Sequence, residues 1–479
     1  MQPDSGPQHH PTAPRQRALV TAAMMGGIFL AAMDITAVAP AMPRIVGALG
    51  GGELYAWAFS VYAVLSTTTT PVFGRIADRR GRKRTFLAGI SIFLLGSAAS
   101  GAAPSMPAFI GARAVQGIGA AALMTTAFTV VGDLYRLRER AKIQGYLSGV
   151  WGIASILGPL VGGTLVAAVG WPWIFYMNIP VGIAAAILVV MHLHEEGYPR
   201  QGTSLDFIGG TFFSGAVLLL LVSLKLHGSG FVATLLSALG AALIFIIREK
   251  HARQPLFDLA LFRIPVYRVA NGAGFFAGAV LLSLSAYLPV YVMNARSGSA
   301  VLSGLMLTPM SMGWVLAAAL GSRVLVRLGY WRVAIPGLAV ITTALFGISR
   351  IRLETSWALI VPLMFVIGIG FGMSFTTFLV SVQEEVGTEK RGEATSAVQF
   401  FRQIGGALGV AILELVFVSR LSDANLLEAT PGRVFSALQQ AELVAGFQVA
   451  FLVATAFAAV ALLFGLFAPA RGRTAGSGR

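Results

Sequence analysis

GRIADRRGRKRT, residues Gly74 to Thr85, joins two apolar runs of the sequence, Leu54 to Phe73 and Thr85 to Ala103. Six of its residues are Lys or Arg, and one, Asp78, is acidic. Each apolar run has roughly the 20 residues that a helix needs to cross a bilayer. A related stretch, GSRVLVRLGYWR from Gly321 to Arg332, lacks the acid. A basic loop that recurs between apolar runs predicts a membrane protein with two related halves.

The composition of the whole chain supports this prediction. Of 479 residues, 56% are hydrophobic and 11% are charged, whereas about a quarter are charged in a soluble protein. The absence of cysteine excludes disulfides and thiolate metal sites. All six histidines fall in polar segments, so a metal site or histidine-based catalysis within the membrane lacks its usual groups. We therefore expect no metal site and no enzyme.

The apolar runs predict an all-α membrane protein with 14 transmembrane helices, arranged as two six-helix bundles plus two inserted helices. The predicted spans are Ala18 to Ala39, Leu54 to Phe73, Thr85 to Ala103, Ala108 to Val131, Ile143 to Val169, Trp173 to Val190, Leu205 to Leu224, Gly230 to Ile247, Val266 to Met293, Leu302 to Leu325, Val333 to Ile348, Trp357 to Leu379, Ser396 to Val418 and Leu443 to Phe467. The predicted domains are a tail (1–17), the N-terminal bundle (18–191), a linker with the two inserted helices (192–253), the C-terminal bundle (254–468) and a second tail (469–479).

The basic residues predict the orientation of these spans. With the N-terminus inside, inner segments hold 26 of the 35 Lys and Arg residues, outer segments hold seven, and two, Arg113 and Arg402, lie within spans. This bias sets membrane orientation, so both termini are expected in the cytoplasm. It also accounts for the net charge of +15 without a nucleic-acid partner. The first sixteen residues are polar, which predicts no removable signal peptide.

Several motifs together resemble the major facilitator superfamily. GRIADRRGRKRT is similar to the loop signature of that family, and RAVQGIGAA (Arg113 to Ala121) to the fourth-helix signature of its drug:proton antiporters. GVWGIASILGPLVGG (Gly149 to Gly163) resembles the fifth-helix antiporter signature, and MDITAVAPAMPRI (Met33 to Ile45) the first-helix signature of the fourteen-span EmrB/QacA branch. The resemblance covers the chain after residue 17 and implies the major facilitator fold.

The resemblance also implies which residues carry function. The cytoplasmic loop signature consists of Gly74, Asp78, Arg79, Gly81, Arg82 and Lys83. The antiporter signature consists of Gly149, Gly152, Gly158, Pro159, Gly162 and Gly163, and the fourth-helix signature of Arg113, Gln116 and Gly117. In the family the acid of the loop approaches the start of a helix of the other half, here near Thr395. The glycines are expected to pack the seam between the halves, although small residues also allow close packing in any membrane protein.

Asp34 and Arg113 are ionisable residues within spans. Asp34 lies 17 residues beyond Arg17, about 25 Å along a helix, and Arg113 lies about 9 Å past Pro107, so both counts give a similar height in the outer half of the bilayer. Two interpretations remain: a permanent ion pair that fixes two helices, or an acid that takes up and releases a proton. Glu414 is the other embedded acid, either a residue at a helix end that reaches the interface or a participant in proton coupling or substrate capture.

The predicted function is proton-coupled efflux of multiple drugs or other lipophilic small molecules across the cytoplasmic membrane by alternating access. The alternative is export of a specific metabolite, antibiotic, amino acid or lipid by the same fold. We expect no cofactor, since the proton gradient supplies the energy. The expected partners are the substrate, protons and the lipid bilayer, and the protein is expected to be a monomer in the inner membrane.

Overall fold

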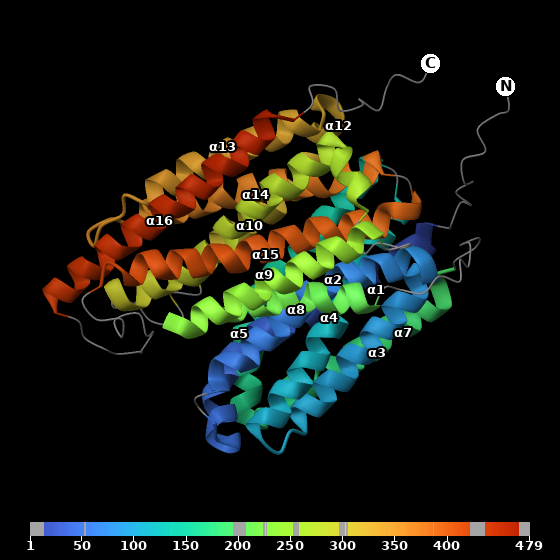
Figure 1. The fold of residues 1–479 in the computed structure, drawn as a ribbon, viewed down its shortest axis with the longest axis horizontal. Coiled ribbons are helices and arrows are strands. Elements are labelled where there is room, and N and C mark those ends of the chain that lie inside the picture. Colours follow the sequence, from blue (N-terminus) through green and yellow to red (C-terminus); the bar gives the residue numbers. More distant parts are fainter. Residues whose placement is uncertain are drawn as a thin grey trace.

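The structure is a computed structural model, and nearly all of its described residues are helical (Figure 1). It describes residues 14–51, 54–135, 137–194, 207–223, 226, 228–251, 258–296, 302, 305–386, 388–421 and 436–468. Most of both predicted tails and much of the predicted linker, including residues 195–206, lie outside these ranges.

The first bundle contains α1 to α7. These helices are α1 (Pro14–Leu49), α2 (Tyr55–Arg80), α3 (Arg82–Gly101), α4 (Met106–Leu134), α5 (Leu137–Ala168), α6 (Trp173–Tyr176) and α7 (Asn178–His192). Inside the bundle α3 packs on α4, α1 on α5 and α7, and α2 on α4. Gly81, with φ +95°, separates α2 from α3, and this backbone conformation strongly favours glycine.

The second bundle contains α10 to α16. Its elements are η2 (Leu259–Arg263), α10 (Pro265–Val290), η3 (Tyr291–Ala295), α12 (Thr308–Leu328), α13 (Tyr330–Ile348), α14 (Trp357–Glu385), η4 (Thr388–Lys390), α15 (Arg391–Val418) and α16 (Ala437–Leu466). Here α10 packs on α15 and α16, and α14 on α12 and α13. In Figure 1 this bundle, yellow to red, lies above the blue and green first bundle.

The two bundles meet along two pairs of helices. One pair is α2 with α15, and the other is α5 with α12. The additional helices α8 (Phe207–Ser223) and α9 (Gly228–His251) pack against each other. α8 also contacts α2, and its Phe213 ring lies 5.0 Å from the Phe400 ring of α15. The predicted inserted pair therefore lies at the boundary between the bundles (Figure 1), with α9 mostly exposed.

Ten helices in the described part of the chain are long and apolar enough to cross a membrane. The other predicted spans coincide with α2, α5, α8 and α12, which are shorter or less apolar. Ten candidate spans agree with a multi-span helical membrane protein, and the count of fourteen stays a prediction.

Several predicted spans differ from the observed helices in their boundaries, and α1 differs most. α1 continues ten residues past the predicted end at Ala39, because Ala41, Met42 and Ile45 are buried in a core with Phe109 and Phe175. Burial of apolar side chains stabilises this extra length of helix. The sixth predicted span is divided into the short α6 and the longer α7.

Candidate functional site

Asp34 and Arg113 form an ion pair inside the first bundle. Both side chains are 1% exposed or less, so the pair is closed off from water. The Gln116 Nε2 donates a hydrogen bond to Asp34 Oδ1 at 2.7 Å, and Arg113 donates to Asp34 Oδ2 and, at 2.6 Å, to Gln116 Oε1. Asp34 and Arg113, for which the sequence predicted similar heights in the bilayer, are therefore in direct contact. Each oxygen of Asp34 accepts a hydrogen bond.

Two aromatic rings complete the surroundings of Arg113. The guanidinium carbon lies 4.3 Å from the centre of the Tyr62 ring and 6.0 Å from the centre of the Phe175 ring. The Tyr62 hydroxyl donates to the Ala31 carbonyl at 3.4 Å, which fixes the ring next to α1. A guanidinium over an aromatic face is stabilised by the charge distribution of the ring. Nothing in the sequence marked Tyr62 as a member of this cluster.

A second charged cluster joins the two bundles at the end where α2 stops and α15 begins. Asp78 accepts hydrogen bonds from the backbone N–H of Gly392 at 2.8 Å and of Glu393 at 2.7 Å. The predicted contact of this acid with the start of a helix of the other half is therefore present. A carboxylate is stabilised at this place by the positive end of the helix dipole. Gly74 allows the approach, because a Cβ there would lie 2.2 Å from Ser396 Oγ.

Arginines extend the Asp78 contact into a chain of ion pairs. The buried Arg82 forms ion pairs with Asp78 Oδ1 at 2.9 Å and with Asp133 Oδ2 at 2.8 Å. Arg391 bonds Asp133 Oδ1 at 2.6 Å, so α2, α3, α4 and α15 are connected through their charges. Burial raises the pKa of Asp78 to about 7, because the cost of desolvating the carboxylate exceeds the stabilisation by Arg82 and the two backbone N–H groups.

Further polar contacts connect helices at the same end of the molecule as Asp78. Lys83 donates to the Val190 carbonyl at 2.7 Å, which ties α3 to α7 within the first bundle. Between the bundles, Arg140 of α5 forms an ion pair with Glu384 of α14. Arg79 of the loop signature is half-buried next to Asp78. Asp133, Arg391 and the Arg140–Glu384 pair were not selected from the sequence, since basic and acidic residues near span ends are common.

The antiporter signature is divided between two interfaces. Gly149 and Gly152 face Val315 and Ser311 of α12 in the other bundle, as the predicted seam requires. Gly158 and Gly162 instead contact α1: a Cβ at Gly158 would lie 2.0 Å from Thr36 Oγ1, and one at Gly162 would lie 2.5 Å from the Ala37 carbonyl oxygen.

For these two positions the prediction of a seam between the halves is wrong, because the tight packing is inside the first bundle, next to Asp34. Gly163 faces open space and packs neither interface. The side chain of Pro159 lies outside the described set. In the fourth-helix signature, Gly117 lets α4 approach α2, since a Cβ there would lie 2.5 Å from the Tyr62 carbonyl oxygen.

Glu414 is separate from the Asp34 cluster. It lies four residues before the end of α15, and its side chain is exposed. No described residue forms a hydrogen bond or ion pair with it. The structure therefore places Glu414 at the surface of the second bundle, whereas Asp34 is enclosed in the first.

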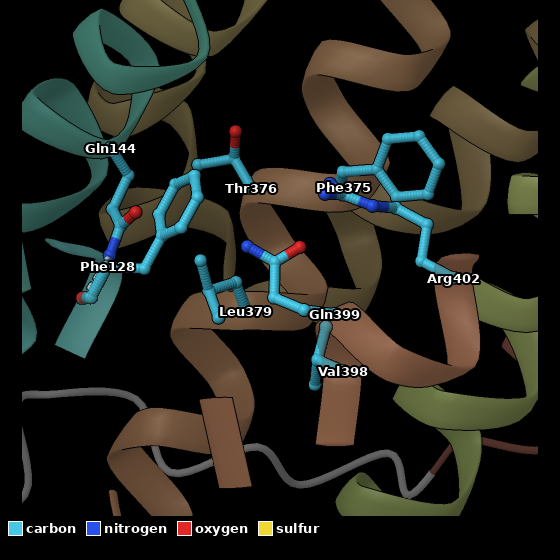
Figure 2. Close-up of a pocket in the computed structure, with 8 residues that line it drawn as sticks. All are labelled: Phe128, Gln144, Phe375, Thr376, Leu379, Val398, Gln399 and Arg402. Carbon is cyan, nitrogen blue, oxygen red and sulfur yellow. Dashed lines mark hydrogen bonds between the residues drawn. The ribbon is translucent and has the colours of Figure 1, made fainter. Parts of the chain in front are cut away.

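A cavity lies between the two bundles (Figure 2). It is partly open to its surroundings and is lined from the first bundle by Phe128 and Gln144. The second bundle contributes side chains of α14 and α15, namely Phe375, Thr376, Leu379, Val398, Gln399 and Arg402. Arg402 was noticed in the sequence as an arginine within a span, but nothing there showed that it lines a cavity.

Comparisons with known proteins agree with this architecture. A family model described as Major Facilitator Superfamily matches residues 24–410. The chain is 33% identical over 420 residues to Multidrug transporter protein MdtP of Bacillus subtilis (strain 168), covering 86% of this chain and 77% of that protein. It is 30% identical to Multidrug resistance protein 3 of the same organism, covering 85% of this chain and 81% of that protein.

Among solved structures, the human organic anion transporter MFSD10 (TETRAN) matches 95% of this chain and 100% of its own chain, with a TM-score of 0.66. Its 15% sequence identity shows a shared fold alone. Together the family match and the relatives indicate a multi-pass membrane transporter and not an enzyme.

Proposed function

Because the chain belongs to the Major Facilitator Superfamily, we propose that it is a proton-coupled exporter of lipophilic small molecules that works by alternating access. The enclosed cluster of Asp34, Arg113 and Gln116 carries this proposal. An ionisable group in the membrane is costly, and in transporters such groups belong to proton relays or substrate pathways. The multidrug relatives support the substrate class.

Asp34 is the proposed proton acceptor. In the closed cluster both of its oxygens accept hydrogen bonds, so protonation requires Arg113 or Gln116 to move away. Arg113 has the face of the Tyr62 ring as a second partner, which offers the guanidinium a place while Asp34 is neutral. Proton uptake is then linked to a rearrangement of α1 against α4, the two helices that carry the pair.

The remaining features complete the proposal. We place the chain in the fourteen-span EmrB/QacA branch, in the inner membrane, with both termini in the cytoplasm and as a monomer. The proton gradient serves as the energy source in place of a cofactor. One proton moving down about 150 mV provides roughly 3.5 kcal/mol, which supports about a 300-fold gradient of a neutral substrate. One acid is therefore sufficient.

The Asp34→Asn variant tests the proposal in inside-out vesicles. Asparagine keeps an oxygen for Arg113 but has no ionisable proton, so substrate-induced proton release should fall roughly 100-fold, to background. The amount of protein in the membrane, measured by immunoblot, should stay within twofold of wild type. Export by this variant with the same dependence on the proton gradient as wild type would refute the assignment.

A further inference from the structure

The cavity between the bundles contains a positive charge without a counter-charge. The Arg402 guanidinium carbon lies 5.3 Å from the centre of the Phe375 ring, and Figure 2 shows the two side chains side by side. None of the eight lining residues is acidic. No described residue forms an ion pair or a hydrogen bond with the Arg402 side chain, so its N–H donors are free for an occupant of the cavity.

Uncharged polar groups in the same cavity also lack partners. Gln399 is 2% exposed, yet neither its Nε2 nor its Oε1 has a hydrogen-bond partner among the described residues. Gln144 donates to the Phe128 carbonyl at 3.3 Å, while its Oε1 is unpaired within the same set. Buried polar groups in proteins are almost always hydrogen-bonded, and leaving them unpaired costs free energy. The lining is therefore complementary to a polar group that enters the cavity.

The rest of the lining is apolar and aromatic. Phe128, Phe375, Leu379 and Val398 supply the hydrophobic part. The Phe375 ring is stacked on Phe371 at 5.3 Å and lies 5.2 Å from the Trp314 ring. A matching ligand has one polar head and one apolar body.

The geometry points to an amphipathic organic monoanion as the occupant of this cavity, with its carboxylate or sulfonate bound by Arg402 and Gln399. A guanidinium offers parallel N–H donors that fit a carboxylate in a bidentate manner. The apolar body then lies against Phe128 and Phe375. This inference rests on the proposed exporter function and names its substrate class.

The charge of the head group discriminates between ligands. A cation would lie next to a like charge, and a neutral molecule would leave the guanidinium unpaired, which is costly in an apolar surrounding. An anion removes this cost. Because α4 and α5 supply one side of the cavity and α14 and α15 the other, an occupant contacts both halves of the transporter.

Three probes with the same ring test the inference: 1-naphthaleneacetate, 1-naphthaleneacetamide and 2-(1-naphthyl)ethylammonium, with charges of −1, 0 and +1. Binding is measured by calorimetry with purified protein in lipid nanodiscs, and empty nanodiscs correct for partition into lipid. We expect the acetate to bind at least tenfold more tightly than the other two. Equal affinity of acetate and acetamide for the wild-type protein would overturn the inference.

Variants test whether Arg402 causes the preference for the acetate. Arg402→Gln should weaken acetate binding about tenfold, to the level of the acetamide, without changing acetamide binding, and Arg402→Lys should keep part of the preference. Arg268→Gln, which removes an exposed arginine of α10, is the matched control and should bind all three probes as wild type does. An acetate preference that survives Arg402→Gln, or an equal loss of all three probes, would refute the role of Arg402.

Binding is measured without a proton gradient, so its outcome does not depend on proton coupling. Absence of substrate-induced proton release would refute the proposed exporter and leave the anion preference standing. Absence of the anion preference would refute only the substrate class.

Discussion

The two arginines within the membrane-spanning helices have opposite surroundings. Arg113 in the first bundle is enclosed, paired with Asp34 and bonded to Gln116. Arg402 in the second bundle lines a cavity and lies over the ring of Phe375, and no described residue forms an ion pair or hydrogen bond with its side chain. A buried charge with a partner of opposite sign is compensated within the protein. A buried charge without such a partner favours binding of a ligand of opposite charge. The first arginine therefore fits a role inside the protein, and the second fits a role in binding.

Thermal unfolding of two variants tests this difference most strongly. Arg113→Gln leaves the Asp34 carboxylate buried without its counter-charge, so the free energy of unfolding should fall by about 3–5 kcal/mol. Arg402→Gln removes an unpaired charge and should leave the free energy unchanged or raise it. Melting temperatures of both purified variants in one detergent provide the measurement. A similar loss for both would abolish the distinction between the two sites.

The next largest effect on stability is expected from a substitution that disturbs the packing near Asp34. Gly158→Ala places a methyl group against Thr36, two residues from Asp34, and overpacking of this kind costs about 1–3 kcal/mol. Gly163→Ala, on the same helix but facing open space, should change stability by less than about 0.5 kcal/mol. Melting temperatures again measure the effect, and equal effects would mean that α5 does not pack on α1 through Gly158.

The contact between Asp78 and the start of α15, which joins the two bundles, should depend on pH. When the contact opens, water reaches Asp78 and its pKa should return from about 7 to its ordinary value near about 4. The closed form, in which Asp78 contacts α15, then binds more protons than the open form between these two pKa values. Lowering the pH from about 7.5 to 5.5 should therefore favour the closed form about 20-fold. Asp78→Asn cannot titrate in this range and should show no such change.

The chain has no cysteine, which allows site-specific labels for this measurement. Cysteines introduced at the exposed positions Arg84 and Glu389 carry a donor and an acceptor dye, and energy transfer reports the closed fraction. A closed fraction that decreases on acidification would contradict a raised pKa of Asp78 in the closed form.

The smallest effect is expected at the exposed acid of the second bundle. Glu414 has no hydrogen bond or ion pair among the described residues and its side chain is exposed, so Glu414→Gln should change export less than about twofold. Accumulation of a fluorescent substrate in cells is a suitable assay. A loss comparable to that of Asp34→Asn would show that the second bundle also contributes a proton-binding acid.

The sequence predicted part of this site correctly. The similar heights of Asp34 and Arg113 followed from two counts along helices, because a helix rises by a constant amount per residue and position converts into height. The contact of Asp78 with the start of α15 followed from the resemblance of its loop to a family signature. Asp34 stood out as an acid against apolar neighbours, and Asp78 as an acid among basic ones.

Other parts of the site could not be predicted, because a span that is apolar all round gives no sign of which face a residue occupies. Gln399 and Gln144 could equally have pointed toward lipid, helix or cavity. The glycines of the antiporter signature showed that neighbours approach closely but not which neighbours. For Gly158 and Gly162 these proved to belong to α1.

The sequence by itself indicated the membrane class, two related halves and the superfamily, and it gave Asp34 and Arg113 similar heights. These features depend on composition, loop charge, motifs and distance along a helix. The tertiary structure decided which charges meet and which remain unpaired. Asp34 reaches Arg113 because α1 and α4 pack with those faces together, and Arg402 faces a cavity because two bundles meet around it. Such facts depend on the rotation of each helix about its axis, which is set by packing against residues far away in the chain.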